Sequence, residues 1–373
     1  MMEAGWGDGM STGLASRARQ IFASAGIALN GERDWDVSVH QPEFYARVLR
    51  QGSLGLGESY MDGWWDCPRL DQFFQRLFDA GVDRAATRGW RGLALRAGSA
   101  LFNRQTPRRA GEVARRHYDV GNELYQAMLD QRMVYTAGRW EHAADLNQAQ
   151  EAKLDFVCQK LELGPGMRVL DIGCGWGSFA KFAAERYGAR VDGITLSREQ
   201  LALGQSLCAG LPVQLRLEDY REVEGRYDRL VSLGMFEHVG HKNYRAYFEV
   251  ARRHMAAGGR MFLSTIGSNR TVRSTDPWIE RYIFPNSHLP SIQQVGDAIE
   301  DRFVPLEWHN WAEDYDRTLM AWFANFEAQW GRWQRQYSER FCRMWKFYLL
   351  SSAAAFRTRQ LQDWQMVLFP LGV

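Results

Sequence analysis

The chain has 373 residues, of which 46% are hydrophobic and 24% are charged, and its formal net charge is only +2. This composition is typical of a globular protein with one large and one smaller domain, and a nearly neutral chain is not expected to bind nucleic acid. No apolar run approaches the ~20 residues that a membrane-spanning helix needs. The first residues also lack the basic and then apolar pattern of a secretion signal.

The cysteines and tryptophans indicate the cellular compartment and the kind of surface that the protein contains. The five cysteines are scattered, with neither the spacing of metal ligands nor a disulfide framework, so we expect a protein of the reducing cytoplasm without a metal site. The 15 tryptophans indicate large apolar surfaces, either in a core or against a lipid-like ligand.

Short helices and a glycine-rich stretch are predicted at the N-terminal end. Residues 1–15 are expected to be a loose tail. Between Gly52 and Asp66 several glycines interrupt the helical pattern, and Trp64 and Trp65 are adjacent. We interpret this stretch as a compact loop held by buried aromatic rings, with direct ligand contact as the alternative. Helices are predicted at 17–25, 44–51 and 70–80.

Residues 84–116 are strongly basic. They contain nine arginines and a single acid, Glu112, with apolar side chains interleaved. Such a segment suits an anionic bilayer surface, where each cation adds ~1 kcal/mol. Nucleic acid or a solvated linker would produce the same pattern. We expect the segment to contact anionic lipid head groups.

The rest of the chain is organised around the stretch Val169–Gly177, which reads V-L-D-I-G-C-G-W-G. A short apolar run ends in Asp171, glycines follow at every second position, and 178–187 has a helical pattern. A strand, a glycine turn and a helix bring a ligand close to backbone N–H groups at the helix N-terminus. A tight connection without any ligand is the alternative for this loop alone.

Strands and helices alternate after this loop. Alternation of this kind forms a doubly wound parallel sheet whose ligands bind at the carboxyl ends of the strands. We therefore predict an α/β fold with a mostly parallel sheet and a smaller, mainly helical N-terminal domain. Polar side chains close the strands at Asp171, Thr195, Asp219 and Glu237. Strands are predicted at 167–171, 189–196, 213–217, 227–232, 258–266 and 303–311, and helices at 151–163, 178–187, 197–208, 244–255 and 291–299.

The C-terminal part contains two further features. Residues 267–290 form a long irregular connection, which in a compact domain is typical of a lid or a substrate wall. Aromatic side chains recur at three- and four-residue steps from Trp322 to Trp345, which predicts the apolar face of one long helix or a helix pair across 318–350. A place in the core is the default for this face, and a cover over an acyl-chain pocket is the alternative.

The glycine loop lacks the G-x-G-x-x-G of nicotinamide enzymes and the G-K-[ST] of P-loop enzymes. It resembles the nucleoside loop of S-adenosylmethionine-dependent methyltransferases. The resemblance implies that Gly173 and Gly175 pack on the methionine part of the cofactor. It also places Thr195 and Gln200 near the ribose and Asp219 near the adenine amino group. The cofactor-binding residues that it implies are Tyr135, Thr136, Asp171, Gly173, Gly175, Trp176, Gly177, Thr195, Leu196, Gln200, Glu218 and Asp219.

Over nearly its whole length the chain resembles the cyclopropane fatty-acyl-phospholipid synthases, which are relatives of the mycolic acid cyclopropane synthases and fatty-acid methyltransferases. The motifs are HYDVGN at 117–122, LDIGCGWG at 170–177, GMFEHVG at 234–240, STIGS at 264–268, DPWI at 276–279, YIFPN at 282–286, WHNW at 308–311 and DYDRTLMAW at 314–322. The resemblance implies transfer of a methylene from S-adenosylmethionine across a cis double bond of an unsaturated phospholipid at the inner face of the membrane. It also implies a homodimer.

Catalytic residues follow from the same resemblance. The alkene attacks the cofactor's methyl group and becomes a carbocation, and the ring closes when a base removes a proton from that methyl group. In this family the base is a bound bicarbonate. The side chains of Glu237 and Tyr315 and backbone N–H groups near Ala137 and Ile266 are implied to hold it, and Ser264 is a further catalytic candidate at this site. From the residues alone, Glu237 has an alternative role as a cap of the following helix.

The chain departs from the family pattern near this site. Ser264 stands where the family has a histidine, and Ala137 and Ser352 stand where it has cysteines. A hydroxyl can still hydrogen-bond an anion. If Ser264 does not, the product becomes a methyl-branched or methylated chain rather than a ring. The aromatic faces of Tyr315, Trp278 and Phe236 are candidates for stabilising the carbocation.

Two domains are therefore expected. Residues 1–110 are assigned to a helical, lipid-contacting domain with its basic linker, and 111–373 to the methyltransferase domain with an aromatic helical cover. The leading function is cyclopropane formation, and the alternative is a fatty-acyl C-methyltransferase that stops before ring closure. More distant alternatives are a small-molecule methyltransferase and a lipid-surface module without catalysis.

Overall fold

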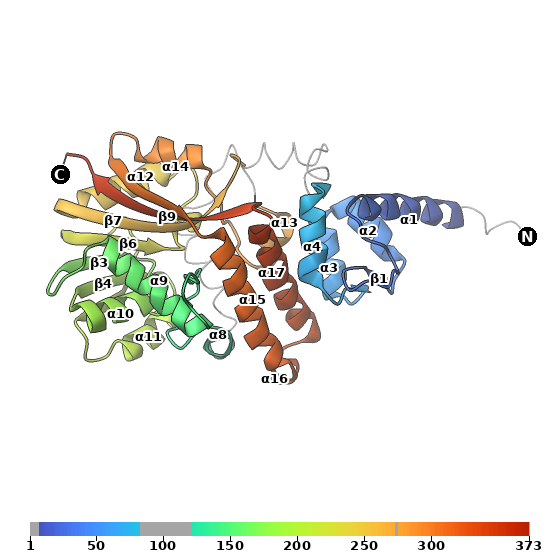
Figure 1. Ribbon diagram of the computed structural model, residues 1–373, viewed down its shortest axis with the longest axis horizontal. Helices are drawn as coiled ribbons and strands as arrows, with labels where there is room; N and C mark the ends of the chain where they lie inside the picture. Colours follow the sequence, from blue (N-terminus) through green and yellow to red (C-terminus); the bar gives the residue numbers. More distant parts are fainter. Residues whose placement is uncertain (1–6, 83–120, 273–274, 373) are drawn as a thin grey trace, which may run out of the picture.

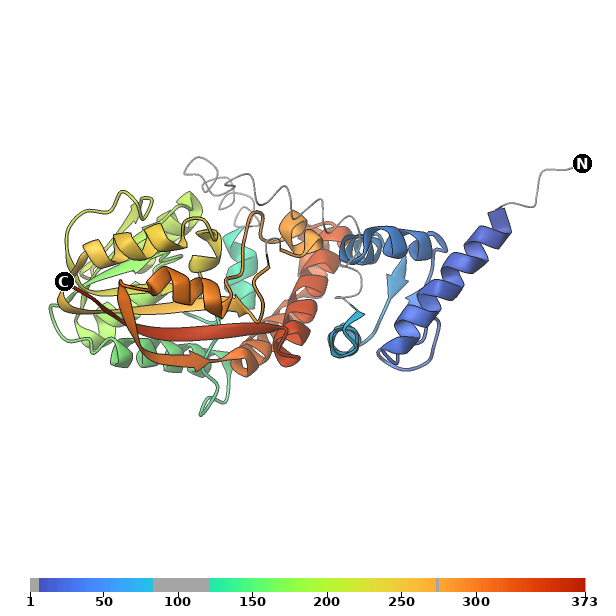
Figure 2. The same ribbon diagram turned by 90° about the horizontal axis from the view of Figure 1, so that it is seen from above.

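A computed structural model of the protein describes residues 7–82, 121–272 and 275–372. The basic segment 84–116 and the first part of the HYDVGN motif lie outside the described residues, and so does the tail before Gly7. Figures 1 and 2 show an elongated molecule in which a seven-stranded sheet with its helices occupies one end and a small helical unit occupies the other. No helix within the described ranges is long and apolar enough to cross a bilayer.

The large unit is built on one mixed sheet of order β5-β4-β3-β6-β7-β9-β8. The five strands from β5 to β7 are parallel, and β9 runs antiparallel between β7 and β8. This confirms the predicted doubly wound, mostly parallel sheet. The strands are β3 (Arg168–Ile172), β4 (Arg190–Thr195), β5 (Val213–Leu217), β6 (Tyr227–Leu233), β7 (Met255–Ser268), β8 (Phe303–Asn310) and β9 (Leu361–Pro370).

Helices cover both faces of the sheet because successive strand residues point to opposite sides. Val169 of β3 packs with α9 and α10, whereas the next residue, Leu170, packs with α12 and α14 on the other face. These helices are α9 (Leu146–Lys160), α10 (Ser178–Tyr187), α11 (Arg198–Leu207), α12 (Tyr244–Arg253) and α14 (Ile292–Ile299). The predicted helices are thus confirmed, with ends that shift by a few residues.

The small unit contains four helices among its described residues and a two-stranded sheet. Two predictions for this unit are wrong. The first helix already begins at Gly7, and the stretch after Gly52 is a helix rather than a loop. Its central glycine, Gly57, is required by packing, because a Cβ there would lie 2.3 Å from Cδ1 of Trp278. The elements are α1 (Gly7–Ser24), β1 (Ser38–Val39), α2 (Glu43–Gln51), α3 (Ser53–Met61), β2 (Trp65–Asp66) and α4 (Leu70–Asp79).

The aromatic C-terminal stretch joins the two units. It forms three helices rather than one or two, and α17 packs against α3, α4 and α15. Trp322, Trp333 and Trp345 belong to the same buried cluster as the aromatic rings of α2, α3 and α4. The face is therefore core between the units, which was the default interpretation. The helices are α15 (Ala312–Ala328), α16 (Trp330–Gln336) and α17 (Glu339–Arg357), and α8 (Asn122–Met128) lies against α15.

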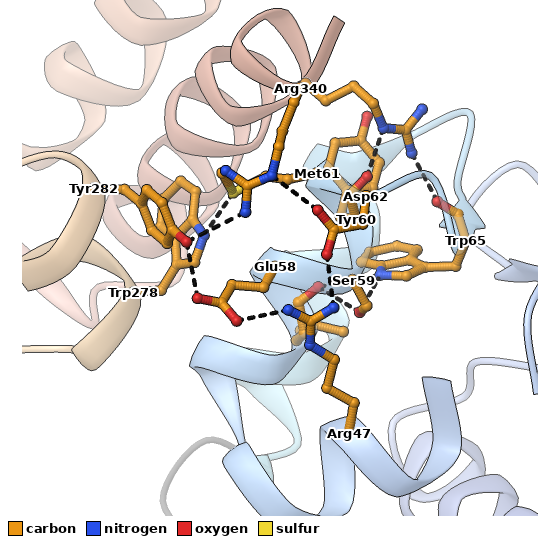
Figure 3. A network of polar contacts seen from close by, with 12 residues as sticks. Arg47, Glu58, Ser59, Tyr60, Met61, Asp62, Trp65, Trp278, Tyr282 and Arg340 are labelled. Atoms are coloured by element: carbon orange, nitrogen blue, oxygen red, sulfur yellow. Dashed lines mark hydrogen bonds and ion pairs between the residues drawn. The ribbon is translucent and has the colours of Figure 1, made fainter. Parts of the chain in front are cut away.

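A polar network also crosses this boundary (Figure 3). The carboxyl of Glu58 on α3 accepts hydrogen bonds from Arg47 (2.6 Å) and from the hydroxyl of Tyr282 (2.8 Å). Asp62, at the end of α3, accepts from Arg47 and from Arg340 of α17. Tyr282 belongs to α13 (Pro277–Tyr282), a helix within the connection that was predicted to be irregular. Both the apolar cluster and this network therefore fix α3 against the large unit.

Candidate active site

The glycine loop forms the tight connection that its sequence predicts. β3 ends at Ile172 and α10 begins at Ser178. Gly173 and Gly175 between them have φ angles of 85° and 56°, a region that residues with a Cβ avoid. At Gly173 a Cβ would also lie 2.7 Å from the side chain of Met235. The backbone therefore turns sharply at the carboxyl end of β3, where ligands of such sheets bind.

A cavity of about 220 Å³ opens at this end of the sheet. Eleven of the twelve predicted cofactor-binding residues line it. The exception is Gly177, whose α-carbon faces Cys208 and Leu215 instead. Lining residues that were not predicted include Lys153, His238 and Asn286, which come from elements far from the glycine loop in sequence. The predicted residues that line the cavity are Tyr135, Thr136, Asp171, Gly173, Gly175, Trp176, Thr195, Leu196, Gln200, Glu218 and Asp219.

Polar groups at the ends of β4 and β5 are held in place by local hydrogen bonds. The hydroxyl of Thr195 lies 3.3 Å from Oε1 of Gln200, and Ser197 caps α11. Burial alone would raise the pKa of Asp219, but the guanidinium of Arg221, 2.6 Å from Oδ2, holds it below its usual value. A charged carboxylate and an amide therefore border this part of the cavity.

Two buried ionisable groups, Asp171 and Lys153, also line the cavity. Asp171 is 2% exposed, and its Oδ2 has no hydrogen-bond partner among the residues described. Burial raises its pKa to about 7 and lowers the pKa of Lys153 to about 8. Nζ of Lys153 donates to the hydroxyl of Thr136 at 2.9 Å, and Gln150, one turn earlier on α9, donates to the carbonyl of Thr136 at 2.8 Å. α9 thus fixes the Tyr135–Thr136 segment against the cavity.

Glu237 extends the hydrogen-bond ladder of the sheet beyond the end of β6. Leu233, the last residue of β6, lies opposite Ser264 of β7. Two residues further along β7, the N–H of Ile266 donates to Oε1 of Glu237 at 2.6 Å. Glu237 lies in the short 3₁₀ helix η1 (Phe236–His238), so its carboxyl binds a neighbouring strand and the helix-capping alternative is wrong.

The second oxygen of Glu237 is the most unusual feature of the site. The side chain is 5% exposed, yet its Oε2 has no hydrogen-bond partner within the described part of the chain. Burial raises the pKa of Glu237 to about 7, and the N–H of Ile266 and, less strongly, the hydroxyl of Thr265 oppose this rise. A buried oxygen without a donor costs free energy unless a ligand or water satisfies it.

None of the predicted catalytic residues lines the cavity itself; Glu237 is next to His238, which does line it. Ser264 is buried, and its carbonyl accepts the N–H of Gly234 at 3.0 Å. Ala137 is buried next to Thr136. Tyr315 on α15 stacks on Phe356 with ring centroids 4.4 Å apart. The N–H of Ile266 is directed at Glu237 rather than at open space.

Two aromatic candidates lie elsewhere. Trp278 is 1% exposed and packs on Phe347 at the boundary between the two units, with ring centroids 4.5 Å apart. Phe236 is fully buried and stacks on Tyr244 of α12. Neither ring lines the cavity.

Sheet order, glycine loop and cavity together define the class. The fold of the class I S-adenosylmethionine-dependent methyltransferases is a seven-stranded sheet with one antiparallel strand next to its edge and a ligand cavity at the glycine loop that here follows β3. Residues 105–366 match the family model described as mycolic acid cyclopropane synthetase. The chain belongs to this family.

Individual relatives agree with the family assignment. The chain is 49% identical over 356 residues to the cyclopropane-fatty-acyl-phospholipid synthase of Escherichia coli, covering 95% of this chain and 93% of the relative. It is 32% identical to the tuberculostearic acid methyltransferase UfaA1 of Mycobacterium tuberculosis, covering 98% and 87%. Among solved structures it is similar to the mycolic acid cyclopropane synthase CmaA1 complexed with SAH and CTAB, with 31% identity, a TM-score of 0.65 and coverage of 69% and 97%.

Proposed function

We propose that the protein transfers a methylene from S-adenosylmethionine across a cis double bond of an unsaturated phospholipid acyl chain and so forms a cyclopropane fatty acid. The similarity to the Escherichia coli synthase over nearly the whole of both chains supports the substrate class. The observation that carries the chemistry is the buried carboxyl of Glu237: its second oxygen has no donor among the described residues, and the adjacent residue His238 lines the cofactor-type cavity.

The cavity residues fit the cofactor. S-adenosylmethionine supplies an electrophilic methyl group on a sulfonium centre. Gly173 and Gly175 leave the backbone accessible where a side chain would intrude, and the unsatisfied oxygen of Asp171 is an acceptor for a donor on the ligand. Gln200 and Asp219 offer an amide and a charged carboxylate for the hydroxyl and amino groups of the nucleoside. The remaining lining residues of the predicted set, such as Trp176 and Leu196, provide the apolar walls.

Ring closure needs a weak base and a stabilised cation. Glu237 lies at the end of the sheet where the cavity opens, and its free Oε2 is an acceptor for the O–H of bicarbonate. Tyr315, which the family resemblance assigns to the anion site, is our aromatic candidate for the cation, although none of the rings of Tyr315, Trp278 and Phe236 lines the cavity. Glu237 keeps its proton at pH values below about 7, and we expect it to accept hydrogen bonds from the anion site when it is ionised.

Methylation without ring closure is the second candidate. Two observations favour it: Ser264 provides no imidazole at the base site, and UfaA1 of Mycobacterium tuberculosis is named as a methyltransferase. The products differ in chemistry. A saturated methyl branch carries two more hydrogens than a ring, whereas a methylated alkene has the mass of the ring and is distinguished by NMR.

Access to the substrate is part of the proposal. The double bond lies within a bilayer, so the enzyme must work at a lipid surface. We assign this contact to the N-terminal unit, residues 1–110, and to the basic segment 84–116, whose arginines would attract anionic head groups from the cytoplasmic side. We also expect a homodimer, which sedimentation of the purified protein would test.

The test uses purified full-length protein, vesicles of unsaturated phospholipid and labelled S-adenosylmethionine. We expect labelled lipid whose NMR spectrum contains cyclopropane signals. Glu237→Gln should lower turnover by at least tenfold, while Glu300→Gln, an exposed acid far from the cavity, serves as the matched control. A wild-type protein that binds S-adenosylhomocysteine but leaves the lipid unlabelled would refute the proposal. Labelled lipid without a ring would establish the second candidate, and Ser264→His should then restore the ring.

A further inference from the structure

Residues 283–288 form a wall segment that contacts two parts of the site. They follow directly after α13 and belong to the connection that the sequence predicts to be irregular. Pro285 and Asn286 line the cofactor-type cavity. Two residues after Asn286, the N–H of His288 donates to the backbone carbonyl of Glu237 at 2.8 Å. The wall segment therefore borders the cavity and also supports the residue that carries the proposed chemistry.

The residue just before the wall segment is attached to the small unit. The hydroxyl of Tyr282 donates to the carboxyl of Glu58 on α3 at 2.8 Å (Figure 3). Burial would raise the pKa of Glu58, but hydrogen bonds from Arg47 and Tyr282 hold it below its usual value. Glu58 is therefore ionised at neutral pH, and a hydrogen bond to a charged acceptor is stronger than one between neutral groups. Arg340 of α17 donates to the same hydroxyl at 3.3 Å.

The start of the wall segment is fixed to α13. The N–H groups of Ile283 and Phe284 both donate to the carbonyl of Ile279, at 3.0 and 2.9 Å. Ile283 is also buried, with 1% of its surface exposed. The chain thus leaves α13 in one defined direction. A shift of Tyr282 is passed on to the wall segment, because the next two residues are hydrogen-bonded to the same helix.

Aromatic contacts connect the wall segment to the rest of the cavity. The ring of Phe284 packs against His238 and against Tyr348 of α17, with centroids 6.1 and 5.8 Å apart. The hydroxyl of Tyr348 lies 2.9 Å from that of Tyr135. His238 and Tyr135 both line the cavity. Displacement of Phe284 would therefore disturb cavity residues from two other parts of the chain.

We propose that Tyr282 and Glu58 are positioning residues of the cofactor site: the hydrogen bond between them holds the wall segment against the cavity and against Glu237. No described residue of the small unit lines the cavity, so the small unit acts on the cofactor through this bond. The effect on cofactor affinity is independent of the lipid product, whereas the effect on turnover rests on the proposed function.

The first test measures amide hydrogen exchange of residues 283–290 in the ligand-free protein by mass spectrometry. We expect Tyr282→Phe to speed exchange in this stretch, because the wall segment opens locally when its attachment is lost. Tyr187→Phe is the matched control. Tyr187 is likewise the last residue of its helix, and its hydroxyl donates to the carboxyl of Asp155 on another helix at 2.6 Å. Wild-type exchange in Tyr282→Phe, or equally fast exchange in Tyr187→Phe, would overturn the inference.

The second test measures S-adenosylhomocysteine affinity by calorimetry, without lipid. Tyr282→Phe and Glu58→Ala should each raise the Kd about three- to tenfold, and the double variant should be no weaker than either single variant, because both changes break the same hydrogen bond. Glu58→Gln keeps an acceptor for Tyr282 and should stay within about twofold of wild type. Additive losses would refute the link between Tyr282 and Glu58. An equal loss in Glu58→Gln and Glu58→Ala would assign the effect to the ion pairs of Glu58 and also overturn the inference.

Turnover on unsaturated phospholipid vesicles separates this role from lipid contact. In Tyr282→Phe the KM for S-adenosylmethionine should rise, while the lipid concentration that gives half-maximal rate stays unchanged. A change confined to the lipid requirement would mean that Tyr282 acts through the lipid contact of the small unit, and it would refute the positioning role. If wild-type protein labels no lipid, the proposed function fails, but hydrogen exchange and calorimetry still decide whether Tyr282 and Glu58 position the wall segment.

Discussion

Gly57 offers a sharp test of how the two units are held together. It lies in the middle of α3, where alanine would normally stabilise a helix by ~1 kcal/mol relative to glycine. In this structure a Cβ at position 57 would lie 2.3 Å from Cδ1 and 2.4 Å from Nε1 of Trp278. Carbon atoms pack optimally at ~3.5–4.0 Å, so Gly57→Ala forces the helix and the indole apart by more than 1 Å.

The indole has little freedom to move. Trp278 is 1% exposed, its ring packs on Phe347, and its Nε1 lies 3.3 Å from the sulfur of Met61 on α3 (Figure 3). Overpacking of this kind costs ~1–3 kcal/mol. After the gain in helix propensity is subtracted, we expect Gly57→Ala to lower the free energy of unfolding by up to ~2 kcal/mol.

Urea unfolding followed by tryptophan fluorescence measures this effect. Gly296→Ala is the matched control, because Gly296 lies in α14, where an added Cβ would meet no atom within 4 Å, and this variant should gain up to ~1 kcal/mol. S-adenosylhomocysteine affinity should stay unchanged in Gly296→Ala, since α14 does not line the cavity. If Gly57→Ala is as stable as Gly296→Ala, the close packing of α3 on Trp278 does not exist in solution.

Three further predictions concern the cavity, the buried acids and a helix end. Gly173→Ala should weaken S-adenosylhomocysteine binding at least tenfold in calorimetry, because φ at this position is 85° and the added Cβ would meet Met235. Gly166→Ala is the control: its φ is 78°, but the added Cβ would meet no atom within 4 Å, so it should cost only ~1–2 kcal/mol of stability. Burial raises the pKa of Glu237 from 4.5 to about 7, so the folded ligand-free protein binds more protons than the unfolded chain in this window. Glu237 by itself should lower stability by ~3 kcal/mol as pH rises from 4.5 to 7, and Asp171 and Asp363 act in the same direction, so Glu237→Gln should make the slope shallower without removing it. Ser338 caps α17 by accepting the N–H of Phe341, so Ser338→Ala should cost ~1 kcal/mol of unfolding free energy, against less than ~0.5 for Ser206→Ala on the exposed side of α11.

Part of the fold was missed because of contacts between distant segments. Gly57 interrupts the helical pattern in the sequence, yet α3 is a helix at this position. The glycine is explained by packing, because Trp278, more than 200 residues away, fills the space that a Cβ at position 57 would need. β9 was not predicted at all. Its residues Leu361–Pro370 alternate less than those of a half-exposed strand, since β9 is buried on both faces between β7 and β8.

Some residues of the candidate site could be predicted from the sequence, and others were found only in the structure. Sequence patterns located the glycine loop, the polar strand ends and Glu237. They did not indicate Lys153, because it lies within α9 and only the packing of this helix on the sheet brings its side chain to the cavity.

By itself the sequence determined the class of fold, the cofactor loop and the family, because the period of apolar residues and the spacing of glycines are local properties that the backbone must obey. Tertiary structure alone decided which carboxyl groups lose their water. The pKa of Glu237, Asp171 and Asp363 depends on burial by residues that are remote along the chain, and so does the unsatisfied oxygen from which the chemistry was inferred.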